Sequence, residues 1–99
     1  MAVRVIVWDK PALLQFKNAI RYIFKKSVQN SEKVMNEILE KIDGLSAHPE
    51  KFPPDKYKKN NAGDYRAFEL HRFRVSYFVG DNEIRITRIR NTKRKPRRY

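Results

Sequence analysis

The spacing of apolar residues changes once along this chain, and that change limits the possible folds more than any other feature. Between Lys10 and Leu45 the apolar side chains recur every three to four residues, as in amphipathic helices. From Tyr65 to Arg90 they alternate with polar residues, as in half-buried strands. A chain of 99 residues is the size of one domain, so we treat residues 1–99 as a single domain that joins helices to a sheet.

The first half predicts a strand and two helices. Val3–Trp8 is a β-branched run that reads as a strand, and a helix follows from about Lys10 to Ser27, with Asp9 as its N-cap. Residues 29–31 predict a break, with Ser31 as the cap of a second helix that ends near residues 44–48. So short a connection predicts an antiparallel helical hairpin. Residues 48–63 hold three prolines and no periodicity, which indicates a loop.

The second half predicts three strands, Tyr65–His71, Arg74–Val79 and Glu83–Arg90, with a hairpin turn at residues 80–82. The predicted fold class is therefore α+β, in the order β-α-α-β-β-β. The helical hairpin should pack on one face of a small, mainly antiparallel sheet. Alternation breaks in the last strand, because Arg88 falls on the inward side and Ile89 on the outward side. We expect a β-bulge near Thr87–Ile89.

Positive charge is concentrated on the strands and after them. Residues 1–50 carry 8 basic and 6 acidic side chains, whereas residues 51–99 carry 15 basic and 5 acidic ones. From Arg85 to Tyr99 there are 8 basic residues and no acidic one. Strand alternation turns many of these cations to the sheet face away from the helices, which favours binding of a polyanion such as RNA or DNA. The polar side chains assigned to that face are Glu69, His71, Arg74, Ser76, Arg85 and Arg90.

Several classes of protein are disfavoured by the composition. The chain has no cysteine, which argues against disulfides and thiolate metal sites, and its two histidines lie too far apart for a zinc site. We expect no metal and no cofactor. No apolar run approaches the ~20 residues of a membrane helix, and the N-terminus lacks the pattern of a signal peptide. We therefore predict a cytoplasmic protein that makes no membrane contact.

The order and length of these elements resemble the RelE/ParE toxin superfamily of bacterial type II toxin–antitoxin systems. The resemblance spans nearly the whole chain and is strongest over residues 64–99, in the segments DYRAFEL, FRVSY and IRITRIRNTKR. It implies a toxin that a co-expressed antitoxin holds inactive. The RelE-like branch cleaves mRNA in the ribosome, whereas the ParE-like branch poisons DNA gyrase. Both branches share the fold, so the fold alone does not choose between them.

The ribonuclease branch implies specific roles for residues that match its motif. Arg74 and Arg94 correspond to its phosphate-binding arginines, and Tyr99 corresponds to the tyrosine that follows them. Glu69 and His71 are the candidates for a general base, because they are the titratable side chains expected on the same face near neutral pH. The alternative for these two is structural: an ion pair for Glu69 and a turn for His71.

Three functions follow from these expectations. The first, which the arginine-lined face favours and which we predict, is inhibition of translation by a metal-independent endoribonuclease that acts on mRNA in the ribosome; the other two are alternatives. The second is a gyrase inhibitor without catalysis, which the absence of basic residues at Ala67 and Glu69 favours. The third is a non-toxic nucleic-acid-binding module. The expected partners are a cognate antitoxin with the ribosome and mRNA, or with gyrase, and the free toxin is expected to be a monomer. The expected nucleic-acid contacts are Arg85, Arg88, Arg90, Lys93, Lys95, Arg97 and Arg98.

Overall fold

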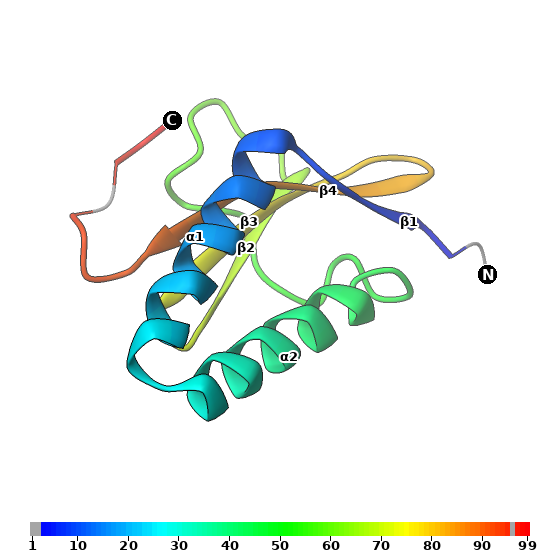
Figure 1. The fold of residues 1–99 in the computed structure, drawn as a ribbon. Coiled ribbons are helices and arrows are strands. Elements are labelled where there is room, and N and C mark those ends of the chain that lie inside the picture. The colour runs from blue at the N-terminus through cyan, green and yellow to red at the C-terminus, as the bar shows by residue number, and fades with distance from the viewer. Residues whose placement is uncertain (1–2, 96) are drawn as a thin grey trace.

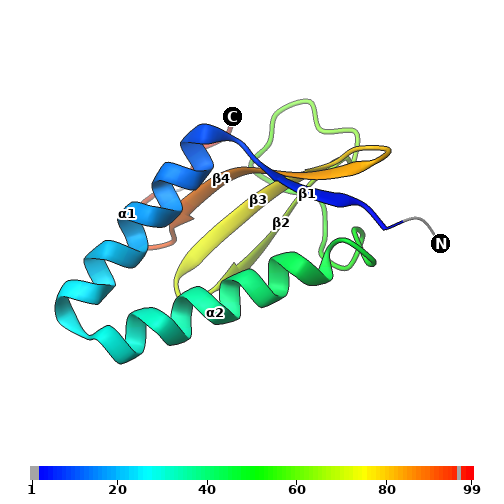
Figure 2. The ribbon, with the colours of Figure 1, turned by 45° about the vertical axis from the view of Figure 1, so that its right-hand side comes forward.

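The helices and strands follow the predicted order in the computed structural model, which describes residues 3–95 and 97–99 (Figure 1). Both helices lie on the same face of the sheet and diverge from their connection as a V, so part of the sheet is visible between them (Figure 2). The elements are β1 (Val5–Trp8), α1 (Lys10–Lys26), α2 (Val28–Gly44), β2 (Tyr65–Leu70), β3 (Phe73–Val79) and β4 (Glu83–Asn91).

The sheet has the strand order β1-β4-β3-β2. The hairpins β2–β3 and β3–β4 are antiparallel, whereas β1 pairs with β4 in parallel. The predicted α+β class, with a helical hairpin on a mainly antiparallel sheet, is confirmed. No helix in the described part of the chain is long and apolar enough to cross a membrane.

The connection between the helices is shorter than predicted. α2 begins at Val28, so the predicted break at residues 29–31 is wrong. Ser27 alone has an extended backbone, and its side chain accepts a hydrogen bond from Asn30 N. Ser31, predicted to cap the helix, is buried inside it, and its hydroxyl donates to the carbonyl of Val28. A serine four residues before another serine offers two caps, and burial of Ser31 decides between them.

The core lies between the helical hairpin and the sheet. Phe16 of α1 and Ile38 and Ile42 of α2 pack against inward side chains of all three long strands. Tyr77 is fully buried at the centre of the sheet, where its hydroxyl donates to the carbonyl of Pro49 at 2.9 Å. Inward residues therefore follow the alternation expected from the sequence.

The predicted β-bulge is confirmed in β4. Tyr77 pairs with Ile86, but its neighbour Ser76 pairs with Arg88, so Thr87 is the extra residue. The bulge reverses the parity of the strand beyond it. Ile89 consequently returns to the core, and Arg88 and Arg90 point to the face of the sheet opposite the helices, which we call the open face.

The β2–β3 hairpin corrects the predicted position of His71. β2 ends at Leu70, and both His71 and Arg72 have positive φ angles, 53° and 67°, as a two-residue type I′ turn requires. The turn carries His71 away from the open face, and its Nε2 lies 3.2 Å from Glu37 Oε1 of α2. The prediction that His71 shares a face with Glu69 is wrong because strand alternation ended one residue earlier than assumed.

The proline-rich segment before β2 lies along the outer edge of that strand. Pro54 forms an isolated antiparallel bridge with Arg66, and Asp55 N donates to the carbonyl of Tyr65 at 2.8 Å. Asn61 closes the following loop, because its side chain donates to the Tyr65 carbonyl and accepts from the Tyr65 amide. This pairing places the side chains that follow Pro54 beside the open face.

Candidate functional site

The open face is hollowed where β3 and β4 pass beneath the last residues of the chain. The hollow has a volume of about 160 Å³. Two segments far apart in sequence form its walls, because Tyr99 N donates to the Tyr57 carbonyl at 2.8 Å and Lys59 N donates to the Tyr99 carbonyl at 2.6 Å. Its lining includes Tyr57, Arg74, Arg88, Arg90, Arg97 and Tyr99.

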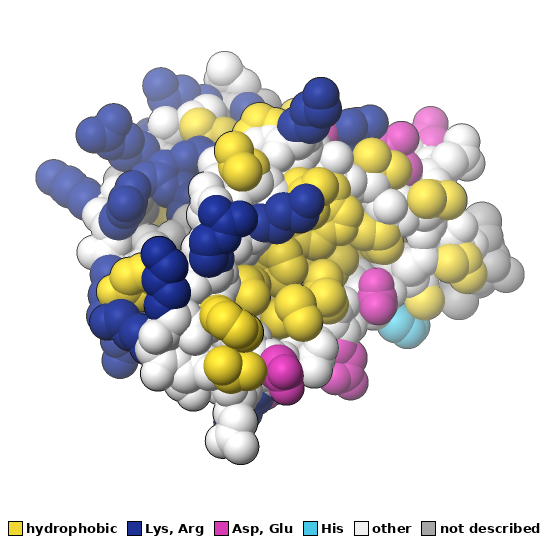
Figure 3. All heavy atoms as spheres, in the orientation of Figure 1, with side chains coloured by type: hydrophobic (Ala, Val, Ile, Leu, Met, Phe, Trp, Pro, Cys, Tyr) yellow, Lys and Arg dark blue, Asp and Glu magenta, His cyan; other side chains and the backbone are white. Residues whose placement is uncertain are grey.

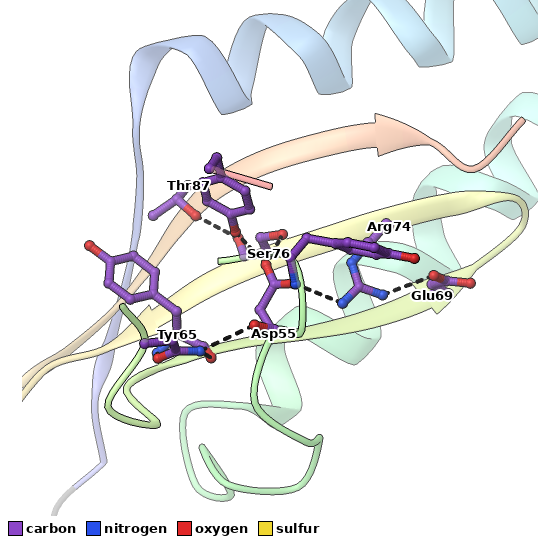
Figure 4. A network of polar contacts seen from close by, with 9 residues as sticks. Asp55, Tyr65, Glu69, Arg74, Ser76 and Thr87 are labelled. Carbon is purple, nitrogen blue, oxygen red and sulfur yellow. Dashed lines mark hydrogen bonds and ion pairs between the residues drawn. The ribbon is translucent and has the colours of Figure 1, made fainter. Parts of the chain in front are cut away.

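Asp55 is the centre of a polar network at the base of this hollow (Figure 4). Its Oδ1 accepts from Arg74 Nη2 at 2.9 Å and from Tyr57 N at 3.0 Å. Its Oδ2 accepts from Ser76 Oγ at 3.1 Å and from the Tyr99 hydroxyl. The carboxylate therefore joins the proline-rich segment, β3 and the last residue of the chain.

The carboxylate of Asp55 is held ionised. Burial opposes its charge, but the hydrogen bonds from Tyr99, Arg74 and the Tyr57 backbone outweigh burial, so the pKa of Asp55 lies below its ordinary value. A buried carboxylate with four donors is a weak base. Its role in the site is to order its neighbours rather than to accept a proton.

Arg74 is neutralised within the same network. Besides Asp55, it contacts Glu69 through an Nη1–Oε2 distance of 2.9 Å, and its side chain is 16 % exposed. Its guanidinium carbon also lies 4.8 Å from the centre of the Tyr57 ring. Burial opposes the charge of Arg74, but its two carboxylate partners prevail and raise its pKa. Both terminal nitrogens of Arg74 thus bind a carboxylate, whereas its buried Nε has no hydrogen-bond partner in the described part of the chain.

Tyr99 is a hydrogen-bond donor in this site. Burial and the bond to Asp55 raise the pKa of Tyr99 to about 12, so its hydroxyl stays protonated at neutral pH. One face of its ring is covered by Arg88, whose guanidinium carbon lies 4.0 Å from the ring centre. These contacts fix Tyr99 in place.

Four arginines around the hollow form no ion pair within the described part of the chain. We call Arg88, Arg90, Arg94 and Arg97 the arginine cluster. Partial burial, followed by the charges of the other three, lowers the pKa of Arg90. Mutual repulsion of this kind favours an anion that enters among the four.

The remaining predicted contacts lie elsewhere or project into solvent. Arg85 lies on the open face in the part of β4 that precedes the bulge. There it contacts Asp9 at 2.8 Å and Glu83 at 2.7 Å. Asp9 thus occupies the N-cap position of α1 without the predicted cap bond, because Arg85 binds its carboxylate. Lys93, Lys95 and Arg98 are exposed and do not line the hollow, whereas Arg94 and Arg97 are exposed beside it.

Sequence analysis assigned four of these residues to one site, and in the structure all four line the hollow: Glu69, Arg74, Arg94 and Tyr99. Sequence analysis did not single out Asp55 or Tyr57. The available signal was weak: Asp55 is one acidic residue in a lysine-rich stretch, directly after two prolines. No group of three or more metal-ligating side chains gathers within residues 3–95 and 97–99.

Comparisons with known proteins agree with the fold. The model of the ParE toxin of the type II toxin–antitoxin system parDE matches residues 6–96. A solved structure described as the chromosomal ParDE toxin–antitoxin system from P. aeruginosa superimposes with a TM-score of 0.66 and 18 % identity, over 90 % of this chain and 96 % of that chain. At that identity, the likeness concerns the fold.

A second solved structure, the YoeB dimer from Staphylococcus aureus, superimposes with a TM-score of 0.50 and 29 % identity, over 88 % of this chain and 94 % of that one. The search of curated proteins gave no match. The family model covers nearly the whole chain. Of the residues in helices and strands, it leaves out only Val5, the first residue of β1. This protein therefore belongs to the ParE toxin family of type II toxin–antitoxin systems.

Proposed function

We propose that this toxin inhibits DNA gyrase by binding to it, without a chemical step of its own. The observation that carries the proposal is the state of the residues assigned to catalysis. Arg74 is engaged by two carboxylates, and Tyr99 is a protonated donor to Asp55. Membership of the ParE family supports the same conclusion.

Cleavage of RNA by its 2′-hydroxyl requires a base, an acid and cations at the phosphate. His71 lies against Glu37 of α2, away from the hollow. Glu69 contacts Arg74, which matches the structural role considered for it from the sequence. The described side chains around the hollow therefore supply cations, a fixed donor and the carboxylate of Glu69, which is held in the ion pair with Arg74.

Ribosome-dependent mRNA cleavage is the second candidate. The arginine cluster favours it, because four guanidinium groups around one hollow would suit the charge of a reacting phosphate. In this case the base would be Glu69 or a group of the ribosome or the RNA. The two candidates share the open face and differ in whether a bond is broken.

We also propose a cognate antitoxin as partner, since the solved ParDE structure is of a toxin–antitoxin system. Figure 3 shows hydrophobic side chains gathered between the two helices, with lysines and arginines to their left and above them and acidic side chains below and to their right. The large exposed hydrophobic residues of the helical half include Leu13, Leu14, Tyr22, Phe24 and Val28. An antitoxin segment with apolar side chains would cover these residues, since exposed apolar patches mark protein–protein interaction sites.

Two assays with purified toxin separate the candidates. Gyrase supercoiling should be inhibited in proportion to toxin concentration, whereas primer extension on translated mRNA should reveal no new cuts. Restoration of supercoiling by the antitoxin is the control for specificity. Cuts that appear only during translation, with supercoiling unaffected, would reject the gyrase proposal in favour of mRNA cleavage.

A further inference from the structure

The two sides of the molecule differ in chemistry. Every large hydrophobic residue that is exposed in the described chain lies between Val3 and Val28, in β1, the helices or the residues beside them. The hollow on the open face is lined instead by arginines and tyrosines. Arginine and tyrosine are also enriched at protein–protein interfaces, but a group of four arginines without an ion pair in the described chain gives the strong positive charge that is typical of protein–DNA interfaces. The open face therefore has the composition of a nucleic-acid interface.

The arginine cluster is also built rather than merely exposed. Arg88 and Arg90 stand side by side on the open face because the Thr87 bulge turns both outward. Arg97 reaches the same hollow because the Tyr99 hydroxyl and amide attach the last segment to Asp55 and Tyr57.

We infer that the arginine cluster binds the phosphodiester backbone of DNA, and so holds the toxin on the DNA that gyrase has bound. This inference rests on the proposed gyrase function. Guanidinium groups offer paired donors that match phosphate oxygens, and the exposed tyrosine edges beside them suit the sugar or a base. Asp55 and Tyr99 are positioning residues, since they act on the DNA only through the arginines that they place.

The test measures binding of a short labelled DNA duplex by fluorescence anisotropy over a range of salt concentrations. The variant Arg90→Gln/Arg97→Gln removes two cluster charges, and Lys25→Gln/Lys33→Gln removes two exposed charges from the helical side. Thermal unfolding checks that both variants fold. Each phosphate contact contributes about 0.9 to the slope of log K against log salt. We expect the arginine variant to lower that slope by about 2 and the lysine variant to leave it nearly unchanged.

Three results would overturn the inference. Equal loss in the two variants would mean that net charge, and not the cluster, attracts DNA. Tighter binding of single-stranded RNA of the same sequence would assign the cluster to RNA. Displacement of the duplex by polyglutamate of equal charge and concentration would assign it to an acidic protein segment.

Gyrase assays keep this inference separate from the proposed function. If wild-type toxin inhibits supercoiling and the arginine variant inhibits it equally, the cluster takes no part in the complex, and the gyrase proposal survives alone. If wild-type toxin does not inhibit gyrase, the proposed function fails, and the anisotropy series still accepts or rejects the DNA site.

Discussion

Replacing Asp55 by alanine removes the carboxylate on which four donors converge, and it should destabilise the fold more than any other change of an acidic residue. The Asp55 side chain is 0 % exposed, and that of Arg74 is 16 % exposed. Loss of one partner from a buried ion pair costs about 3–5 kcal/mol, because the other charge stays buried without compensation. Arg74 keeps Glu69 at 2.9 Å, so we expect the lower end, about 3 kcal/mol.

For a domain of this size, about 1 kcal/mol lowers Tm by roughly 4–8 °C, so the loss corresponds to about 12–24 °C. Thermal and urea unfolding followed by circular dichroism measure this directly. Asp81→Ala is the matched control, since Asp81 is exposed in the β3–β4 turn. In a double-mutant cycle, adding Arg74→Met to Asp55→Ala should cost less than the sum of the single changes, because the orphaned guanidinium is removed.

The same carboxylate makes stability depend on pH in acid. The pKa of Asp55 is below its ordinary value of 3.8 in the folded protein, so the unfolded chain takes up the proton first as pH falls. Its contribution is complete above about pH 4 and is lost as pH falls through the lowered folded pKa. Asp55→Asn should flatten this acid limb. If Asp55→Ala lost no more stability than Asp81→Ala, the Asp55 network would not stabilise the fold, which would contradict the argument from burial.

Three further predictions concern single positions. Tyr99→Phe should flatten the loss of stability between about pH 10 and pH 12 in alkaline unfolding, since the raised pKa of Tyr99 stabilises the fold only while the hydroxyl stays protonated; an unchanged alkaline limb would contradict the Asp55 bond. Ser27→Ala should cost about 1 kcal/mol in urea unfolding through loss of the α2 cap, with Ser27→Asn as the conservative control. Gly44→Ala should add about 0.4–1 kcal/mol of stability, because the space beside it is open. Gly63→Ala should lose about 1–2 kcal/mol at φ +107°, and equal effects of the two glycine changes would refute this.

Local pattern was sufficient for the elements and for the bulge. Alternation in β2, β3 and β4 identified the side chains that face the helices, although Ala67 and Ser76 of the other face are buried too, and its failure at Arg88 and Ile89 located the extra residue to within one position. Helix ends were less well predicted. Ser27 and Ser31 are both good N-caps in isolation, and only the burial of Ser31 within α2 distinguishes them.

The candidate site was less predictable from the sequence than the helices and strands were. The arginines of β3 and β4 could be placed on one face, because strand parity is a local property. Their charge state could not be predicted, because the carboxylate that neutralises Arg74 comes from a segment with no periodicity, nineteen residues earlier in the chain. The assignment of His71 to the open face was wrong for a related reason. Two positive φ angles in the β2–β3 turn end the strand alternation on which that assignment depended.

Sequence alone was enough to establish the fold class, the concentration of positive charge in the second half and the resemblance to the toxin superfamily, since each depends on composition and short-range spacing. The arrangement of the hollow depended on the folded chain. Asp55, Arg74, Ser76 and Tyr99 are brought together from three segments, and their protonation states and availability for a ligand follow from that contact. Long-range contacts of this kind leave no periodic trace in a sequence, because each partner satisfies its own local pattern independently.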